Sequence, residues 1–433
     1  MERLLVSGAH DKELGAYFGA REYRELADLA RHAVGVPLSD DSARVFVVPG
    51  IMGSQLGLKR QPPLPHDILW IDPIDIGVGR LTSLHLPSGA PIVPLGVVLY
   101  SYLRLKLNLR ASGFAPVLYD YDWRLGVDQL GAALAERIRQ EPVDRIMIVA
   151  HSMGGLVSRA ALAHPGMDKV KRLVLLGTPN SGSYAPLQAL RGTYAVVRKI
   201  ASLVVEGTPE ALAGGIFNSF PSLYHMLPGL GRDGVDLFDP KAWPRSGPRP
   251  DRKLLREARH VRSRLVQADG RISVVVGVGQ ETVTAVERHR DDFIYTITRH
   301  GDGTVPAVSA ALPGARHHYT PAAHSDLTRD PTVAAAVTEL LRTGRTELLP
   351  SKWRSTGSAQ AKISDRQLRR MHTRKVDWAR LEPDERREFL ENLNEPPKLR
   401  LRVPPKVRGT GTANRAGAAR AHGMTPANRK GSR

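Results

Sequence analysis

The stretch that most constrains the fold runs from Arg145 to Arg159 and reads RIMIVAHSMGGLVSR. Its first half is a short, β-branched apolar run, which predicts a strand buried on both faces. After Ser152 and Gly154, apolar residues recur at helical spacing. A strand, a sharp turn and a helix, with a serine at the turn, predict a nucleophile elbow whose strained backbone exposes the serine Oγ above the sheet. The alternative is that Ser152 only caps the helix.

The residues around Ser152 match the needs of such an elbow. Strand and helix nearly touch there, so the positions two before and two after the serine must be small, and they are Ala150 and Gly154. The backbone N–H of Met153, at the start of the helix, is free to donate to an oxyanion. A second donor is expected in the glycine-containing turn after the strand at residues 44–48, namely the backbone N–H of Ile51. The alternative for that turn is a plain connection between strand and loop.

A serine hydroxyl needs a base within hydrogen-bond reach, and the base needs a group that orients it. In this architecture the acid follows a late strand and the histidine follows the last one. Asp302, in the segment HGDGTVP, and His324 occupy those places. The alternatives are a turn aspartate and a surface-loop histidine. His317 and His318 are rivals for the base, whereas the side chain of His151 is expected to point the wrong way.

The composition excludes several classes of site. The 433 residues, 42% of them hydrophobic, suffice for one large domain with appendages or for two domains. The absence of cysteine excludes disulfides, thiolate metal sites and a cysteine nucleophile. Histidines and carboxylates do not fall at metal-ligand spacings, and no glycine-rich phosphate loop is present, so we expect neither a metal nor a cofactor. Without a signal-like or membrane-spanning apolar run, we expect a cytoplasmic protein that can act peripherally at a membrane.

Strands that alternate with helices predict an α/β protein with a mostly parallel sheet flanked by helices. We expect an N-terminal helix in residues 1–40, a catalytic domain in 41–349, a partly helical extension in 350–397, and a disordered basic tail in 398–433. Two insertions interrupt the catalytic domain. One is a proline-rich, lid-like loop at about 57–95, and the other is a helical cap at about 184–270.

The formal net charge of +19 lies mostly in the last fifth of the chain. From residue 398 onward the sequence contains lysines and arginines among Gly, Ala and Pro but no acidic residue. Flexible cations of this kind bind polyanions without geometric specificity. The tail therefore predicts contact with an anionic membrane surface, and nucleic acid is the alternative partner.

Seven motifs, taken together, resemble one known family. They are VPGIMGS (48–54), LWIDP (69–73), YDWR (121–124), AHSMGG (150–155), LGTPNSG (176–182), FPSLYHMLP (220–228) and GDGTVP (301–306). This set is similar to the lecithin:cholesterol acyltransferase and phospholipid:diacylglycerol acyltransferase family, over about residues 44–341. The resemblance implies an α/β-hydrolase core with Ser152, Asp302 and His324 as catalytic triad. It also implies Ile51 and Met153 as oxyanion donors, and acyl transfer from a lipid ester through an acyl-enzyme.

The sequence departs from that family in ways that bear on function. Secreted members carry signal peptides and cysteines, and anchored members carry a membrane span, none of which this chain has. We therefore expect a serine-dependent O-acyltransferase or lipase acting on a lipid ester, with hydrolysis and transfer both open. The alternative is a catalytically silent α/β-hydrolase scaffold that binds nucleic acid or an acidic partner through its basic tail.

Aromatic and aliphatic residues in the two insertions are candidates for contact with acyl chains or membrane. They are Leu69, Trp70 and Ile71 in the lid-like loop, and Phe217 and Phe220 in the cap. The alternative for the lid-like loop is an ordinary packed surface loop.

Overall fold

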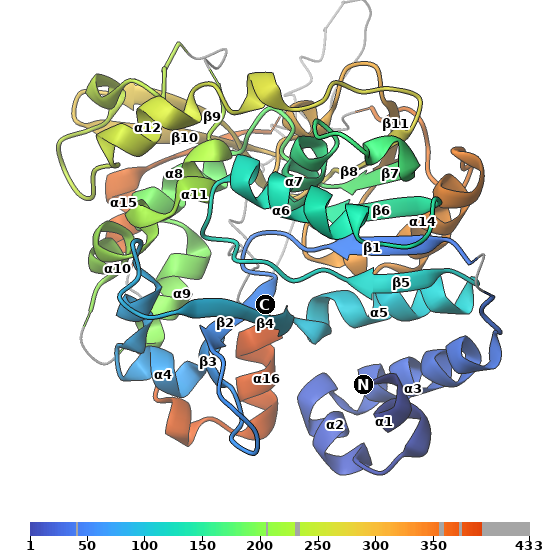
Figure 1. Cartoon of the computed structure of the whole chain (residues 1–433). Helices are drawn as coiled ribbons and strands as arrows, with labels where there is room; N and C mark the ends of the chain where they lie inside the picture. The colour runs from blue at the N-terminus through green and yellow to red at the C-terminus, as the bar shows by residue number, and fades with distance from the viewer. Residues whose placement is uncertain (40–41, 205–206, 230–233, 355–358, 372–374, 392–433) are drawn as a thin grey trace, which may run out of the picture. The chain divides into compact units, whose positions relative to one another are not determined.

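A six-stranded parallel sheet is at the centre of the computed structural model, which describes residues 1–39, 42–204, 207–229, 234–354, 359–371 and 375–391 (Figure 1). Its strands are β1 (Arg44–Val48), β5 (Ala115–Leu118), β6 (Ile146–His151), β7 (Val170–Leu176), β8 (Ile272–Gly277) and β11 (Arg316–Thr320). Their order across the sheet is β11-β8-β7-β6-β1-β5, and every neighbouring pair is parallel. Most of these strands are buried apolar runs, because helices cover both faces.

Alternate residues of each strand point into two separate cores. Phe46 and Val48 of β1 face a core shared with α6 (Val127–Arg139), α7 (Met153–Ala161) and the cap. Val45 and Val47 face a second core with α5 (Leu99–Ala111) and α14 (Pro331–Thr343). A parallel sheet in this order, with a strand–serine–helix turn at its centre, is the α/β-hydrolase fold. This confirms the fold class expected from the sequence.

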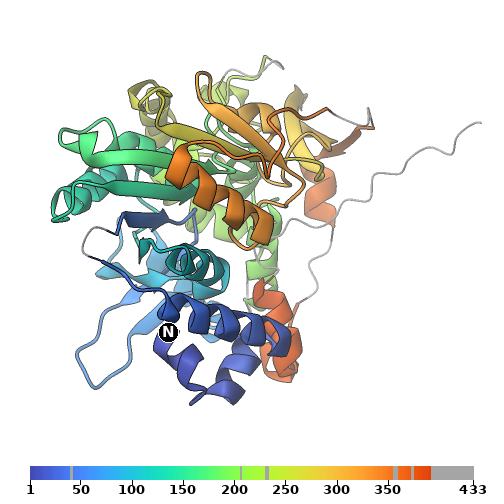
Figure 2. The ribbon, with the colours of Figure 1, turned by 90° about the vertical axis from the view of Figure 1, so that its right-hand side faces the viewer.

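The N-terminal segment forms three helices, so the single expected helix is wrong. They are α1 (Glu2–Ser7), α2 (Asp11–Phe18) and α3 (Ala20–Gly35). Gly19, with φ 83° and ψ 144°, breaks the chain between α2 and α3 in a conformation that favours glycine. The three helices lie against the outer side of α5 (Figure 2), and their core includes Leu103 and Leu107 of that helix.

The lid-like loop contains regular structure that the sequence pattern does not reveal. A small antiparallel sheet joins β2 (Ser54–Leu58) to β3 (Asp67–Trp70) and β4 (Ile92–Val97), with α4 (Pro73–Gly77) between the last two strands. The register shifts on both sides of β2, which interrupts the alternation of apolar and polar residues by which strands are recognised.

The cap and the later elements complete the described chain. The cap helices are α8 (Tyr184–Leu190), α9 (Ala195–Leu203), α10 (Pro209–Gly215), α11 (Pro221–His225) and α12 (Arg252–Ala258). They are followed by the hairpin β9 (Thr282–His289) and β10 (Asp292–Thr298), α13 (Ala307–Ala310), β12 (Ala361–Ser364), α15 (Asp365–Arg370) and α16 (Pro383–Glu391). The expected basic tail, 398–433, lies outside the described residues. No helix of the described chain is long and apolar enough to cross a membrane.

Candidate active site

Ser152 lies at the sharp turn between β6 and α7, with φ 53° and ψ −126°. A non-glycine residue rarely adopts a positive φ, and here it directs the hydroxyl away from the sheet. A small residue is needed two positions after the serine because α7 packs against the end of β1: a Cβ on Gly154 would lie 2.4 Å from the carbonyl oxygen of Pro49. The strained serine and the small neighbour are the two features expected of a nucleophile elbow.

Three side chains from distant parts of the chain form a hydrogen-bonded series at this turn. The Oγ of Ser152 is 2.9 Å from Nε2 of His324, and Nδ1 of His324 is 2.7 Å from Oδ2 of Asp302. Asp302 is buried, and its other oxygen accepts the backbone N–H groups of Thr304 (2.9 Å) and Val305 (2.7 Å). The carboxylate is thus fixed, and it holds the imidazole with Nδ1 protonated and Nε2 free to take the serine proton.

The two backbone N–H groups expected to act as oxyanion donors belong to segments next to Ser152. Met153 is the first residue of α7, and Ile51 lies in the turn after β1. Within the described residues neither N–H group has a hydrogen-bond acceptor. Gly50 brings the turn against the serine, since a Cβ at that position would lie 2.9 Å from Cβ of Ser152. That these two N–H groups form an oxyanion site stays a prediction.

The other histidines near the turn do not contact the serine hydroxyl. His151 is buried, and its ring bonds to the hydroxyl of Tyr102 and to the carbonyl oxygen of His324. Burial lowers the pKa of His151 to about 3, so its ring stays neutral at ordinary pH. His317 and His318 lie on β11 and do not line the cavity described below.

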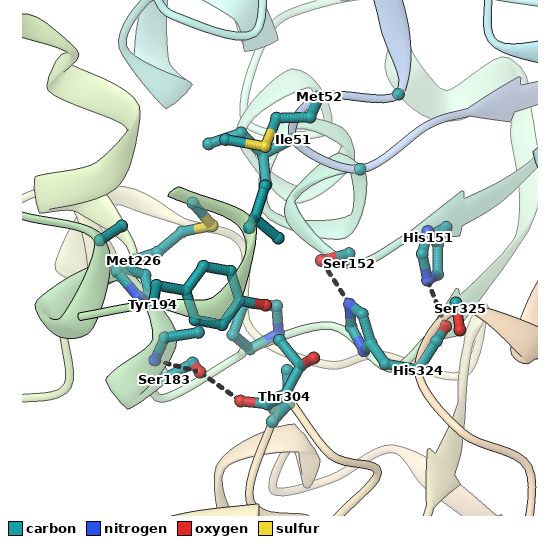
Figure 3. A pocket seen from close by; sticks show the side chains of 18 of the residues that line it. Ile51, Met52, His151, Ser152, Ser183, Tyr194, Met226, Thr304, His324 and Ser325 are labelled. Carbon is teal, nitrogen blue, oxygen red and sulfur yellow. Dashed lines mark hydrogen bonds between the residues drawn. The ribbon is translucent and has the colours of Figure 1, made fainter. Parts of the chain in front are cut away.

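A cavity of about 100 Å³ opens above Ser152 (Figure 3). Side chains from the turn after β1, from α8 and α9, and from the segment after α11 form its walls. The apolar ones are Ile51, Met52, Pro179, Ala185, Pro186, Ala189, Val196, Leu223, Met226 and Val305. Tyr194 and Met226 lie across the cavity from the serine, and burial raises the pKa of Tyr194 to about 12. The walls suit an apolar group next to the reacting hydroxyl.

None of the five apolar contact candidates lines this cavity. Leu69, Trp70, Phe217 and Phe220 are each at most 2% exposed and none lines the cavity, so the expectation that they contact acyl chains or membrane is wrong. Ile71 is partly buried against the same core. Apolar composition alone does not distinguish side chains that pack in the core from side chains that are exposed for binding.

Trp70 instead supports the turn after β1 from within the core. Its ring packs edge-on against Trp123, with 5.2 Å between ring centroids. Its indole N–H donates to the carbonyl oxygen of Met52 at 3.1 Å, which anchors the turn that carries Ile51.

Sequence reasoning missed several residues of the site. Tyr102, whose hydroxyl lies beside His151, belongs to none of the motifs found in the sequence. Leu223 and Met226 belong to the motif FPSLYHMLP, and that motif was the signal that could have identified them. Tyr194 carries no motif. In the described part of the chain no group of three histidines or carboxylates is arranged to hold a metal.

One family model matches a part of the chain, and its description agrees with the fold. The family model described as "PGAP1-like alpha/beta domain" matches residues 129–213, which include Ser152. No curated protein sequence matches the chain.

Among solved structures, a Bacillus licheniformis lipase, BlEst2 in mature form, is 14% identical with a TM-score of 0.38, over 70% of this chain and 94% of its own. The Tle4–Tli4 complex is 16% identical with a TM-score of 0.39, over 70% and 99%. The phospholipase PlaB from Legionella pneumophila is 12% identical with a TM-score of 0.35, over 70% and 60%.

Proposed function

We propose that this chain is a serine-dependent lipid ester hydrolase that works through an acyl-enzyme on Ser152. One observation carries the proposal. A serine at a positive φ lies 2.9 Å from a histidine nitrogen, and a buried carboxylate fixes that histidine from the other side. Serine, base and orienting acid in this relation are what nucleophilic acyl transfer requires.

Each group has a defined part in the reaction. The Oγ of Ser152 attacks the ester carbonyl carbon while its proton passes to Nε2 of His324. Negative charge collects on the carbonyl oxygen, where the N–H groups of Ile51 and Met153 stabilise it. As the C–O bond to the alcohol breaks, the alcohol oxygen takes the proton from His324. Asp302 keeps its charge and stabilises the imidazolium while it exists.

The second half of the reaction releases the acyl group. A water molecule gives a proton to Nε2 of His324 and adds to the acyl carbon, and collapse of this intermediate returns the proton to the Oγ of Ser152. The apolar walls of the cavity favour an acyl chain over a polar group. The lipase and phospholipase names among the similar structures agree with a lipid ester as substrate.

The finer proposal is O-acyl transfer, with a lipid alcohol in place of water in the second half. It is supported by the ordered motif set shared with the lecithin:cholesterol acyltransferase family, parts of which line the cavity at Pro179, Leu223 and Met226. The experiment uses radiolabelled phospholipid with and without long-chain alcohols. Free fatty acid alone supports hydrolysis, whereas labelled ester of the added alcohol supports transfer. No turnover of any ester by folded protein contradicts both and favours a silent scaffold.

We also propose that the basic segment 398–433 attracts the enzyme to anionic membranes, at about 1 kcal/mol per cation near the surface. Deleting residues 410–433 is expected to reduce binding to anionic vesicles at low salt and to leave turnover of a soluble ester unchanged. Equal vesicle binding by both proteins contradicts this role.

A further inference from the structure

A chain of hydrogen bonds runs behind Ser152 and joins the two loops that serve it. The backbone N–H of Gly50 donates to the hydroxyl oxygen of Tyr102 at 2.8 Å. That hydroxyl is 2.9 Å from Nδ1 of His151, and Nε2 of His151 is 2.9 Å from the carbonyl oxygen of His324. Tyr102 and His151 are both buried. The series therefore connects the turn before Ile51 with the backbone of the base.

Only one arrangement of protons satisfies this series. A carbonyl oxygen can only accept, so Nε2 of His151 must carry the proton that it shares with His324. Burial keeps His151 neutral, which leaves Nδ1 as an acceptor. The Tyr102 hydroxyl then donates to Nδ1 and accepts from Gly50. Every polar atom of the series is paired in a fixed direction.

The two ends of the series lie at the two backbone segments whose positions matter most for the proposed reaction. Gly50 precedes Ile51, and the turn closes with a bond from the N–H of Gly53 to the carbonyl oxygen of Gly50 at 3.1 Å. The Tyr102 oxygen is packed against this turn, because a Cβ on Gly53 would lie 2.9 Å from it. At the other end, the carbonyl oxygen belongs to His324, whose ring faces Ser152.

We propose that Tyr102 and His151 are positioning residues that act as one unit. They fix the turn that carries Ile51 relative to the loop that carries His324. The inference rests on the proposed function, because it explains how the groups that take part in that reaction are held in place. Neither residue touches the reacting atoms. They act by fixing the direction of the Ile51 N–H group and the position of the His324 backbone. Loss of residues that support reacting groups in this way commonly changes activity 10- to 100-fold.

A merely structural role would have a different signature. If the series only satisfied buried polar groups, its removal would lower stability and leave kcat of the folded protein unchanged. A positioning role lowers kcat with little change in KM, because an oxyanion donor acts mainly in the transition state. It also weakens a boronic acid inhibitor, whose tetrahedral adduct places an oxygen at the oxyanion donors, by the same factor as kcat/KM.

The experiment compares Tyr102→Phe, His151→Phe and the double variant on a soluble ester. Tyr224→Phe is the matched control, because its buried hydroxyl also donates to a carbonyl oxygen (Asn218, 2.7 Å) and accepts a backbone N–H (Asp251, 2.8 Å). We expect each series variant to lower kcat about 10- to 100-fold. The double variant should be no worse than the poorer single variant, because members of one unit are not additive. Tyr224→Phe should keep kcat within about two-fold.

The results separate this inference from the proposed function. If the unaltered protein hydrolyses the ester and Tyr102→Phe, still folded by circular dichroism, keeps its kcat and its boronic acid affinity, the inference is wrong and the function stands. Losses that multiply in the double variant contradict the single unit. If the unaltered protein shows no serine-dependent turnover, the proposed function itself fails. Should His151→Phe not fold, Tyr102→Phe with its inhibitor affinity decides the question alone.

Discussion

Two buried aspartates in this protein have opposite surroundings. Asp365 accepts Nε of Arg191 at 2.6 Å and a terminal nitrogen of Arg369 at 3.0 Å, and the Tyr295 hydroxyl also bonds to it. Asp302 accepts two backbone N–H groups and one ring nitrogen of His324. Among the described residues no lysine or arginine forms an ion pair with Asp302.

The difference shows how a buried charge can be either structural or reactive. The charge of Asp365 is balanced permanently by arginines, of which Arg191 is fully buried, so it ties the C-terminal extension to the cap. In the proposed mechanism, the charge of Asp302 faces an imidazole that becomes positive while it holds the serine proton. Its balancing partner therefore arises during the reaction, which is the preorganisation that catalysis uses.

The largest expected effect comes from an aspartate-to-asparagine change at Asp302. Asp302→Asn should lower kcat/KM on a soluble ester about 10⁴-fold, since the amide favours the wrong imidazole tautomer. Its thermal midpoint should change little, because no permanent cation loses a partner. Steady-state kinetics and thermal unfolding test both halves. Retention of more than a tenth of the activity would remove Asp302 from the proposed mechanism.

The same aspartate-to-asparagine change at Asp365 should lower stability alone. Asp365→Asn leaves the Arg191 guanidinium buried without its counter-charge, which should lower the free energy of unfolding by about 3–5 kcal/mol. Urea denaturation measures this loss, and active-site titration gives kcat per folded molecule, which should stay within about two-fold. A large loss of kcat in the folded fraction would show that the two aspartates are not separate in function.

Two neutral buried histidines extend the comparison to pH. Burial lowers the pKa of His151 to about 3 and that of His225 to about 4. In the unfolded chain both take a proton near pH 6.5, whereas the folded chain resists it. Stability is therefore fully present above about pH 6.5 and falls as pH drops toward 4, by about 1.4 kcal/mol per pH unit for each histidine.

The variant His225→Gln isolates one of these contributions. Its free energy of unfolding, measured by urea denaturation at pH 7, 6 and 5, should fall less steeply with pH than that of the unaltered protein, by about 1.4 kcal/mol per unit. Equal slopes would mean that His225 takes up a proton as readily in the folded state as in the unfolded state.

The smallest expected effect concerns the cavity beside Ser152 and His324. Met226 forms part of the cavity wall. Met226→Ala should raise kcat/KM for an eight-carbon acyl ester relative to a four-carbon one by about 10-fold, because wall side chains discriminate by roughly this amount per methylene or two. A ratio unchanged across a series of ester lengths would place the acyl chain elsewhere.

Local sequence predicted the elbow because strand, turn and helix are contiguous from Arg145 to Arg159. The order of the chain was enough to select Asp302 and His324, which the structure brings into hydrogen-bond contact with each other and, through His324, with Ser152. The walls of the cavity were beyond such reasoning. Tyr194 and Met226 come to line one cavity through the packing of the cap. The spacing of apolar residues in the sequence does not predict which of them will face a cavity. The same limit made Trp70 seem available for substrate when it packs against Trp123.

The central claim is that Ser152 is an activated nucleophile. The most direct measurement is intact mass spectrometry of the folded protein after treatment with a fluorophosphonate, followed by peptide mapping. We expect one covalent adduct per chain, located on Ser152, absent in Ser152→Ala and formed far more slowly in Asp302→Asn. An unlabelled folded protein, or an adduct on another residue, would contradict it.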